Sequence, residues 1–269
     1  PHPYMFYTWL NSSQYGFGTI EVAEKFGLKW FFIGSDYEFG RESIGMAQKY
    51  LKEKFGDAYK NVGESWPKQG EVDYTAAITK AIAAKPDVVC VVVPGRFVQF
   101  QKQAATMGLK DIAHIHWMYG ERVSAQASGE AAFGITANVD YVVDNPDWPL
   151  SNEFARRFHK KYGYWPGWPA SSTYNGVQTF LLAIEKAKSL DSRKIMRAVE
   201  GIENPKPITG KPFYVRACDH KSVQPIYIAE WIKSDEYAPG RWKIIAKSKN
   251  PELGLLPCEV KAGYDKMKY

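Results

Sequence analysis

The stretch that decides the fold spans residues 28–55 and reads LKWFFIGSDYEFGRESIGMAQKYLKEKF. It starts with a short apolar run ending at Gly34, which is typical of a buried strand. A helical pattern follows, with these apolar positions on one face: Ile44, Ala47, Leu51 and Phe55. Between them lies SDYEFGR, a polar and aromatic loop at the carboxyl end of the strand. Because open α/β sheets bind ligands at that end of their strands, this loop is the first candidate site.

The same strand-then-helix plan recurs along the N-terminal half of the sequence. The run 88–93, VVCVVV, is continuously apolar and predicts a central strand, followed by a helix that stops at Gly108. A further strand is expected at 112–118, with a helix at 122–128, and Asp73 is the expected N-cap of a helix after the extended piece 61–67. These repeats predict an α/β protein with a parallel sheet and right-handed crossovers.

The C-terminal half does not repeat this strand-then-helix pattern. We expect a helix capped by Ser151 and ended by Gly163, a long helix from about 170 to 188, and a shorter one starting at Asp191. Strand-sized runs then follow at 213–217, 224–232 and 242–246, which suit an antiparallel extension. The lysine-rich end, KAGYDKMKY, is expected to be a solvated tail.

Composition excludes several classes of protein. The chain has 269 residues, of which 45% are hydrophobic and 24% charged, as in a folded globular protein, and it contains no apolar run of 18 residues. The net charge of +6 is scattered rather than gathered, so we do not expect nucleic-acid binding. The start, PHPYMFYTWL, lacks a secretory signal, which fits either a cytosolic protein or a processed chain.

Three cysteines leave the redox compartment open. Cys90 lies inside the apolar run and is expected to be a buried thiol. Cys218 and Cys258 either pair, which would indicate an oxidising compartment, or stay reduced, because sequence alone does not establish connectivity.

Several phrases, taken in order, resemble one family. They are GSDYEFGRE, KPDVVCVVVPGRFVQFQKQAATMGLK, SGEAAFGI, STYNGVQTFLLAIEKA and RACDHKSVQPIYIAEW. Together they are similar to the periplasmic binding proteins of the branched-chain amino acid (leucine/isoleucine/valine) type, which are the solute receptors of ABC importers. The resemblance covers residues 4–231 and lies in the order and spacing of many weak motifs.

The resemblance implies two Rossmann-like lobes of the type I fold, joined by three crossovers, with parallel sheets flanked by helices and a solute held between the lobes. The implied divisions are 1–11 as hinge and crossover, 12–138 as the second lobe, 139–212 as crossover and first-lobe helices, 213–247 as the return, and 248–269 as the tail. The family's N-terminal strands have no counterpart here, so the first lobe is expected to be incomplete. Apolar faces on the helices at 151–201 would then lack a sheet to cover them. An intact mass of 30.5 kDa would show that the shortened chain is real.

The resemblance also implies ligand contacts from three second-lobe loops and from one first-lobe loop. The implied residues are Tyr37, Phe39, Gly95, Arg96, Trp117, Tyr119, Glu121 and Trp168. For Tyr37 and Phe39 the alternative is packing on the following helix, and for Arg96 it is a solvated charge rather than a bidentate partner of a carboxylate.

Trp117 occupies the position where amino-acid binders of the family carry an acid for the ligand ammonium. An indole does not pair with an ammonium ion as a carboxylate does, although its face attracts one, and Glu121 is the possible substitute. The solute is therefore expected to be either a small amino acid or a small organic or aromatic carboxylate.

Other motifs have weaker functional readings. His114 and His116 share one face of a strand, which suits two metal ligands, but no third ligand is evident and no metal is expected. Glu21 replaces the third glycine of a dinucleotide loop, and no nucleophile elbow, phosphate loop or acid pair indicates an enzyme.

The resulting hypothesis is an extracytoplasmic, periplasmic solute-binding protein of an ABC importer, without a cofactor and without enzymatic activity. Its expected partners are a small-molecule ligand and an ABC permease in the membrane, and it is expected to be a monomer. The alternative is the ligand-sensing domain of a chemoreceptor or signalling protein.

Overall fold

The computed structural model describes residues 4–258, which divide into two compact units. Unit 1 contains residues 4–11, 140–225 and 250–258, and unit 2 contains residues 12–139 and 226–249. The chain therefore passes between the units at 11/12, 139/140, 225/226 and 249/250. The return to unit 2 comes at Ile226 rather than at residue 213, and the fourth passage adds to the three expected crossovers. The predicted tail, 261–269, lies outside the described residues.

Unit 2 is built on one seven-stranded sheet with the order β2-β1-β3-β4-β5-β8-β9. The first five strands pair in parallel, and the last two pair antiparallel. The mostly parallel α/β fold is thus confirmed. The strands are β1 (Lys29–Gly34), β2 (Lys60–Ser65), β3 (Val88–Val92), β4 (His114–Trp117), β5 (Thr136–Val139), β8 (Tyr227–Lys233) and β9 (Gly240–Lys247).

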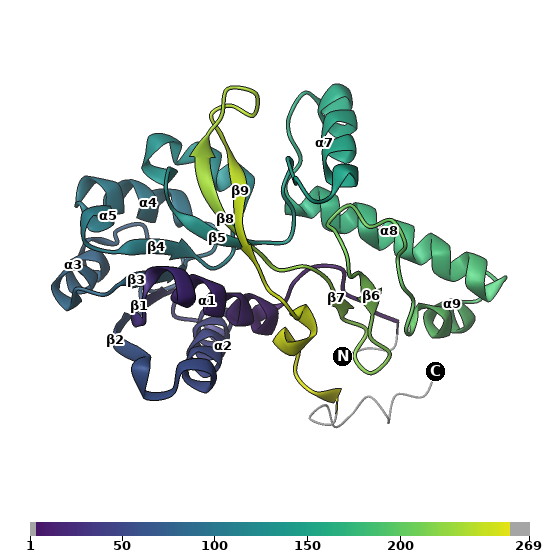
Figure 1. Ribbon diagram of the computed structural model, residues 1–269, viewed down its shortest axis with the longest axis horizontal. Coiled ribbons are helices and arrows are strands. Elements are labelled where there is room, and N and C mark those ends of the chain that lie inside the picture. The colour runs from purple at the N-terminus through teal and green to yellow at the C-terminus, as the bar shows by residue number, and fades with distance from the viewer. Residues whose placement is uncertain (1–3, 259–269) are drawn as a thin grey trace. The chain divides into compact units, whose positions relative to one another are not determined.

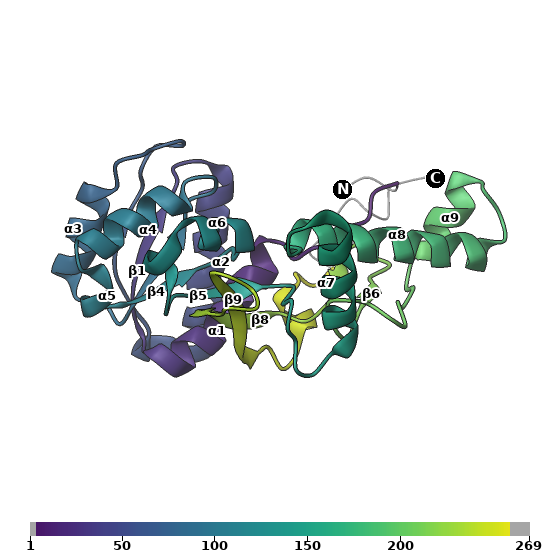
Figure 2. The same ribbon diagram turned by 90° about the horizontal axis from the view of Figure 1, so that it is seen from above.

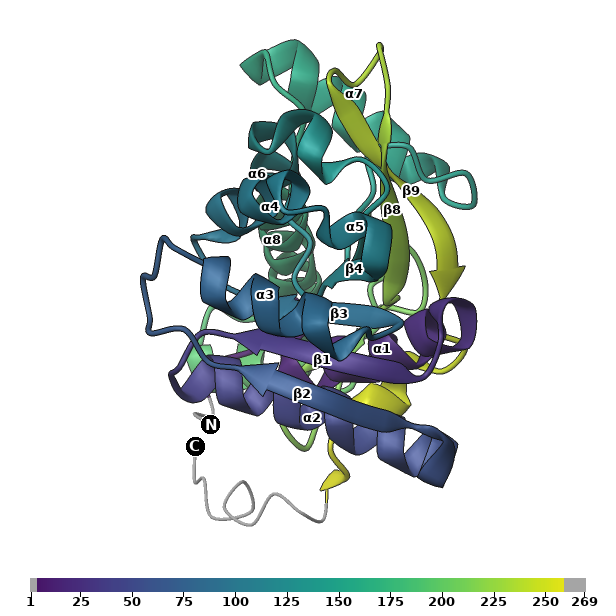
Figure 3. The same cartoon turned by 90° about the vertical axis from the view of Figure 1, so that its left-hand side faces the viewer.

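Helices cover both faces of this sheet. Figure 3 shows α1 and α2 on one face and α3, α4, α5 and α6 on the other, as right-handed crossovers require when the strand order reverses at β2. The helices are α1 (Ser12–Phe26), α2 (Glu38–Phe55), α3 (Thr75–Ala84), α4 (Phe97–Thr106), α5 (Leu109–Ile112) and α6 (Arg122–Ala127), with short 3₁₀ turns at Gly56–Ala58 and Gly129–Ala132.

The centre of the sheet explains why residues 28–55 dominate the fold. Trp30 pairs with Val88 and Phe32 with Cys90, and all four side chains are fully buried between the two helical layers. Strands buried on both faces cannot alternate with polar residues, so they read as continuous apolar runs. The predicted buried state of Cys90 is confirmed.

Two predicted helix caps are wrong. Tyr74 is the N-cap of α3, while the Asp73 carboxylate accepts from the Thr75 backbone N–H at 2.9 Å, one residue outside the expected position. The helix assigned to Ser151 starts earlier, at Pro149, because proline is favoured in the first helical turn. Ser151 is instead a buried residue inside that helix.

Unit 1 contains three helices and a small sheet among its described residues (Figures 1 and 2). The elements are α7 (Pro149–Tyr162), α8 (Trp168–Ala187), α9 (Ser192–Val199), β6 (Tyr214–Val215), β7 (Ser222–Val223) and a 3₁₀ turn at Pro251–Gly254. Asp191 caps α9 as expected, with its carboxylate accepting from the Lys194 N–H at 3.0 Å. The run expected at 213–217 forms the short β6, which pairs with β7 and not with the large sheet.

A disulfide joins Cys218 to Cys258, the pairing that the sequence left open. Beside it, Arg216 and Asp219 form a buried ion pair at 2.5 Å, and Arg216 also donates to the Leu256 carbonyl at 2.9 Å. The end of the described chain is thus attached to the β6–β7 turn by the disulfide and by the Arg216–Leu256 hydrogen bond. No helix among the described residues is both long and apolar enough to cross a bilayer.

Candidate functional site

Three loops of unit 2 meet at one end of its sheet. Strands β1, β3 and β4 are parallel neighbours, so the loops that follow them lie at the same end. Backbone bonds join these loops to the strand beside them, because Ser35 N–H donates to the Val92 carbonyl at 2.9 Å and Met118 N–H to the Val91 carbonyl at 3.2 Å. The sequence-predicted residues of unit 2 all belong to these loops or their borders.

The first loop turns tightly into α2. Gly40 makes this possible, because a Cβ there would lie 2.1 Å from the Ser35 carbonyl oxygen. Tyr37 is the N-cap of α2 and is half-buried, which raises the pKa of its phenol. Ser43 donates to the Phe39 carbonyl at 2.6 Å and so fixes the turn that carries the Phe39 ring.

Phe39 belongs to an aromatic cluster with the third loop. Its ring centroid lies 4.8 Å from that of Tyr119, and Tyr119 lies 4.4 Å from Tyr15 of α1. The Tyr119 hydroxyl shares a 2.6 Å hydrogen bond with the Ser43 hydroxyl. Burial raises the pKa of Tyr119, so its phenol is neutral and the ring is held as a fixed apolar wall.

Sequence reasoning missed Tyr15 and Ser43. The signal for Tyr15 was available, since Ser12, Tyr15 and Thr19 recur at helical spacing. Ser43 carried no such signal, because a hydroxyl inside an amphipathic helix reads as an ordinary polar position.

The second loop presents a cation. Gly95 has a φ of +70° and is exposed, and a Cβ there would meet nothing within 4 Å. Arg96 follows as the half-buried N-cap of α4. Within residues 4–258 its guanidinium makes no hydrogen bond or ion pair, which leaves its five N–H donors available to an anion.

Trp117 and Glu121 are placed differently from one another. Trp117 is 6% exposed and stacks on Phe97, with ring centroids 3.7 Å apart, so one face of the indole is used in packing. Glu121 caps α6: its two carboxylate oxygens accept from the Val123 and Ser124 N–H groups at 2.8 and 2.7 Å. Its charge is thereby directed at the helix N-terminus.

Trp168 belongs to unit 1, where it is the first residue of α8 and half-buried. Its carbonyl accepts from the Ser171 hydroxyl at 3.0 Å. The structure therefore brings together Phe39 and Tyr119 in unit 2, whereas Trp168 belongs to unit 1.

The two strand histidines bind one hydroxyl. His114 Nε2 and His116 Nδ1 lie 2.7 and 3.0 Å from Thr136 Oγ1, so they do share a face of β4. Burial lowers the pKa of His114 to about 4 and, with a contribution from His114, that of His116 to about 3. The described residues contain no group of three or more His, Cys, Asp or Glu side chains that could hold a metal ion.

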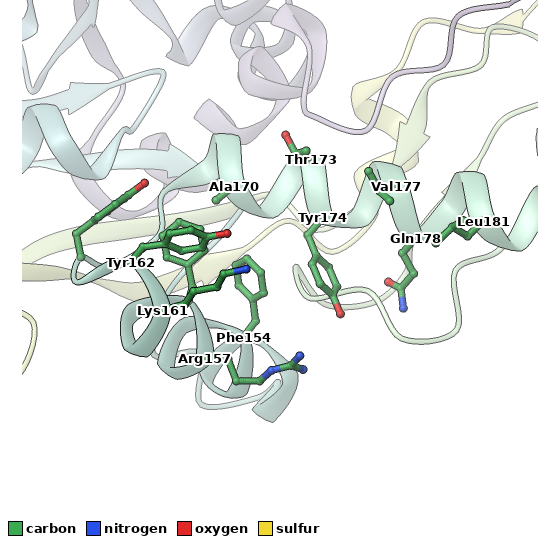
Figure 4. A pocket seen from close by; sticks show the side chains of 12 residues that line it. Phe154, Arg157, Lys161, Tyr162, Ala170, Thr173, Tyr174, Val177, Gln178 and Leu181 are labelled. Atoms are coloured by element: carbon green, nitrogen blue, oxygen red, sulfur yellow. The ribbon is translucent and has the colours of Figure 1, made fainter.

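Unit 1 carries an apolar groove of about 800 Å³ between α7 and α8 (Figure 4). Phe154 of α7 lies 5.0 Å from Tyr174 of α8, ring centroid to centroid, and Val177 and Leu181 are more than half exposed. Within the described part of unit 1 the only sheet is the two-stranded β6–β7. The groove is formed by helix faces, whereas the unit 2 site is formed by loops.

Comparison with known proteins gives a family and a fold. A family model described as "periplasmic binding protein" matches residues 1–236. No curated protein sequence matches the chain.

Three similar solved structures are bacterial transport components. A solute-binding protein of an ABC transporter from Rhodopseudomonas palustris BisB5, in complex with 3,4-dihydroxybenzoic acid, has a TM-score of 0.77 at 26% identity, covering 91% of this chain and 67% of that one. An amino acid ABC transporter substrate-binding protein from Pseudomonas fluorescens Pf-5 has a TM-score of 0.79 at 20% identity, with coverages of 94% and 66%. A branched-chain amino acid ABC transporter periplasmic ligand-binding protein from Burkholderia xenovorans LB400 has a TM-score of 0.81 at 17% identity, with coverages of 94% and 67%. The chain thus spans about two thirds of the length of these structures.

Proposed function

Because the chain belongs to the periplasmic binding protein family, we propose that it is an extracytoplasmic solute-binding protein of an ABC importer whose solute is a small aromatic carboxylate. The proposal includes delivery to a membrane permease, action as a monomer in the periplasm, and binding without chemical turnover.

The observation that carries the choice of solute is the aromatic cluster at the loop end of unit 2. The rings of Phe39 and Tyr119 are half-buried and packed together at an interplanar angle of 45°, and Tyr15 packs on Tyr119, so they offer an apolar wall of tilted rings. Aromatic side chains gain contact energy with another ring in offset or edge-to-face arrangements. A ring-bearing solute suits this wall better than a branched aliphatic one.

The charged groups near the loops also favour an aromatic carboxylate over an amino acid. An amino acid brings an ammonium group that pairs best with an acid. The family resemblance puts Trp117 where that acid is expected, and the Glu121 carboxylate is bound to the start of α6. Arg96 supplies a cation for the solute carboxylate. The complex of the Rhodopseudomonas palustris relative with 3,4-dihydroxybenzoic acid is in keeping with this class of solute.

A thermal-shift screen tests the proposal. The panel pairs benzoate, 4-hydroxybenzoate and 3,4-dihydroxybenzoate with leucine, valine, short amides and urea, and benzamide serves as the neutral analogue of benzoate. A solute at 100 times its Kd stabilises the folded chain by about 2.7 kcal/mol. We expect a benzoate-class acid to shift the melting temperature and benzamide to shift it far less. A strong shift with leucine or valine and none with the aromatic acids would overturn the choice of solute.

Two matched pairs of variants locate the binding groups. Arg96→Gln should remove most of the preference for benzoate over benzamide, while Arg41→Gln, at an exposed arginine already paired with Asp36, should leave it unchanged. Tyr119→Ala should weaken binding strongly, whereas Tyr119→Phe keeps the ring and loses the hydroxyl's bonds to Ser43 and Ser12. Equal affinity in Tyr119→Ala and the wild type would remove the aromatic cluster from the site.

A further inference from the structure

A chain of buried polar groups links the first three segments at which the polypeptide passes between its units. Asp140 is the first residue of unit 1 after β5, and its carboxylate accepts from the Ser172 hydroxyl of α8 at 3.3 Å. The Ser172 carbonyl accepts from the Thr8 hydroxyl at 3.1 Å. The Thr8 carbonyl in turn accepts from the Gln224 amide at 3.1 Å. Thr8, Asp140 and Gln224 thus come from the passages at 11/12, 139/140 and 225/226.

These groups are closed off from water. The exposed fractions are 6% for Thr8, 1% for Asp140, 3% for Ser172 and 0% for Gln224. Gly176 of α8 permits the close approach of Thr8, since a Cβ there would lie 3.0 Å from the Thr8 hydroxyl oxygen. The cluster is therefore a packed junction of three chain segments and not a surface feature.

Asp140 is the one ionisable member of this junction. Burial raises the pKa of its carboxyl to about 7, and its own backbone N–H and the Ser172 hydroxyl oppose that rise only in part. Neither a cation nor a second acid is among the influences on this carboxyl within residues 4–258. A buried carboxylate without a cation is strongly disfavoured relative to the neutral acid.

We propose that Asp140 is a proton-dependent lock on the junction: the neutral carboxylic acid holds the three crossing segments together, and its ionisation loosens them. The lock acts whichever solute the protein binds. The Asp140 carboxyl binds its proton more tightly in the packed junction than in an opened one. Between about pH 4, the ordinary aspartate pKa, and about pH 7, closing of the junction is therefore coupled to uptake of a proton by Asp140. The stabilising contribution is complete below pH 4, falls as pH rises through this range, and is absent above about pH 7.

Hydrogen exchange of residues 5–10, 139–142 and 222–226 measures this lock directly. After correction for the intrinsic pH dependence of exchange, the protection factors of these segments in the wild type should fall about tenfold per pH unit between pH 5 and pH 7, and then level off. Asp140→Asn keeps the shape and the acceptor oxygen but cannot ionise, so its protection should not vary with pH in this range. Asp147→Asn, at an exposed aspartate of the same segment, should keep the wild-type slope.

A second variant keeps the test decisive if Asp140→Asn does not fold. The Ser172 hydroxyl favours the ionised form of Asp140, so Ser172→Ala should move the pH of loosening upward. Parallel pH profiles of protection in the wild type and Asp140→Asn would overturn the proposal. An unchanged midpoint in Ser172→Ala would overturn it as well.

Discussion

Gly40 and Gly45 lie in the same helix, α2, but only Gly45 has room for a side chain. At Gly45, which is exposed, a Cβ would meet nothing within 4 Å. Gly45→Ala should therefore stabilise the fold by about 0.8–1 kcal/mol, the ordinary difference in helix propensity between the two residues. At Gly40 the added Cβ would lie 2.1 Å from the Ser35 carbonyl oxygen, where real contacts do not fall below 3.0 Å.

Gly40→Ala must move the backbone by the missing 0.9 Å (3.0 minus 2.1) because the clash is with a main-chain atom. Overpacking of this kind costs about 1–3 kcal/mol, whereas the propensity gain is common to both positions, so the two variants should differ by about 1–3 kcal/mol. The shift also displaces Phe39, so solute affinity should fall in Gly40→Ala and not in Gly45→Ala.

Urea unfolding followed by tryptophan fluorescence measures the stability difference, since Trp30 is fully buried in β1. Hydrogen exchange of residues 29–34 reports on the same strand independently of unit 1. Equal midpoints for the two alanine variants, or a stabilised Gly40→Ala, would refute the tight turn that the structure places between β1 and α2.

Three further predictions concern the polar and covalent contacts. Cys218→Ser removes a disulfide that spans 40 residues and should cost about 4 kcal/mol of stability by loop entropy, measured by urea unfolding relative to the disulfide-bonded wild type. Asp219→Ala leaves Arg216 buried and unpaired and should cost about 3–5 kcal/mol, whereas Asp36→Ala breaks a half-exposed pair and should cost less than about 1 kcal/mol; similar losses in both would contradict the burial argument. Burial lowers the pKa of His116 to about 3, so the free energy of unfolding falls as pH drops below the unfolded histidine pKa of about 6.5. His116→Asn should make this pH dependence less steep by about 1.4 kcal/mol per pH unit. An unchanged dependence of stability on pH would exclude His116 as a contributor.

The sequence predicted the sheet of unit 2 well because its strands are buried on both faces. Residues 29–34 and 88–93 could hardly be anything else, and β1 and β3 lie there to within a residue. Strand β5 was harder to recognise. TANV is short and includes Asn138, whose amide donates to the Tyr15 carbonyl at 2.7 Å inside the fold. A buried asparagine with a distant partner looks like part of a loop in sequence.

The candidate site was predictable only in outline. The sequence located the three loops, because each follows a recognisable strand, but it could not show which rings touch. The contact between Phe39 and Tyr119 joins positions 80 residues apart, and Tyr15 reaches them from a helix that precedes all three loops. Glu121 shows how sequence can suggest a role that the geometry does not support. Its charge suggested a ligand partner, whereas in the structure its carboxylate caps helix α6.

The central claim, that the loop end of the unit 2 sheet binds an aromatic carboxylate, is tested most directly by a hydrogen-exchange footprint. The exchange of the 269-residue chain is compared with and without saturating benzoate, or the best aromatic acid of the screen. The account predicts added protection at residues 35–41, 95–98 and 117–122, with little change in α7 and α8. Protection confined to the groove between α7 and α8, or absent from all three loops, would contradict it.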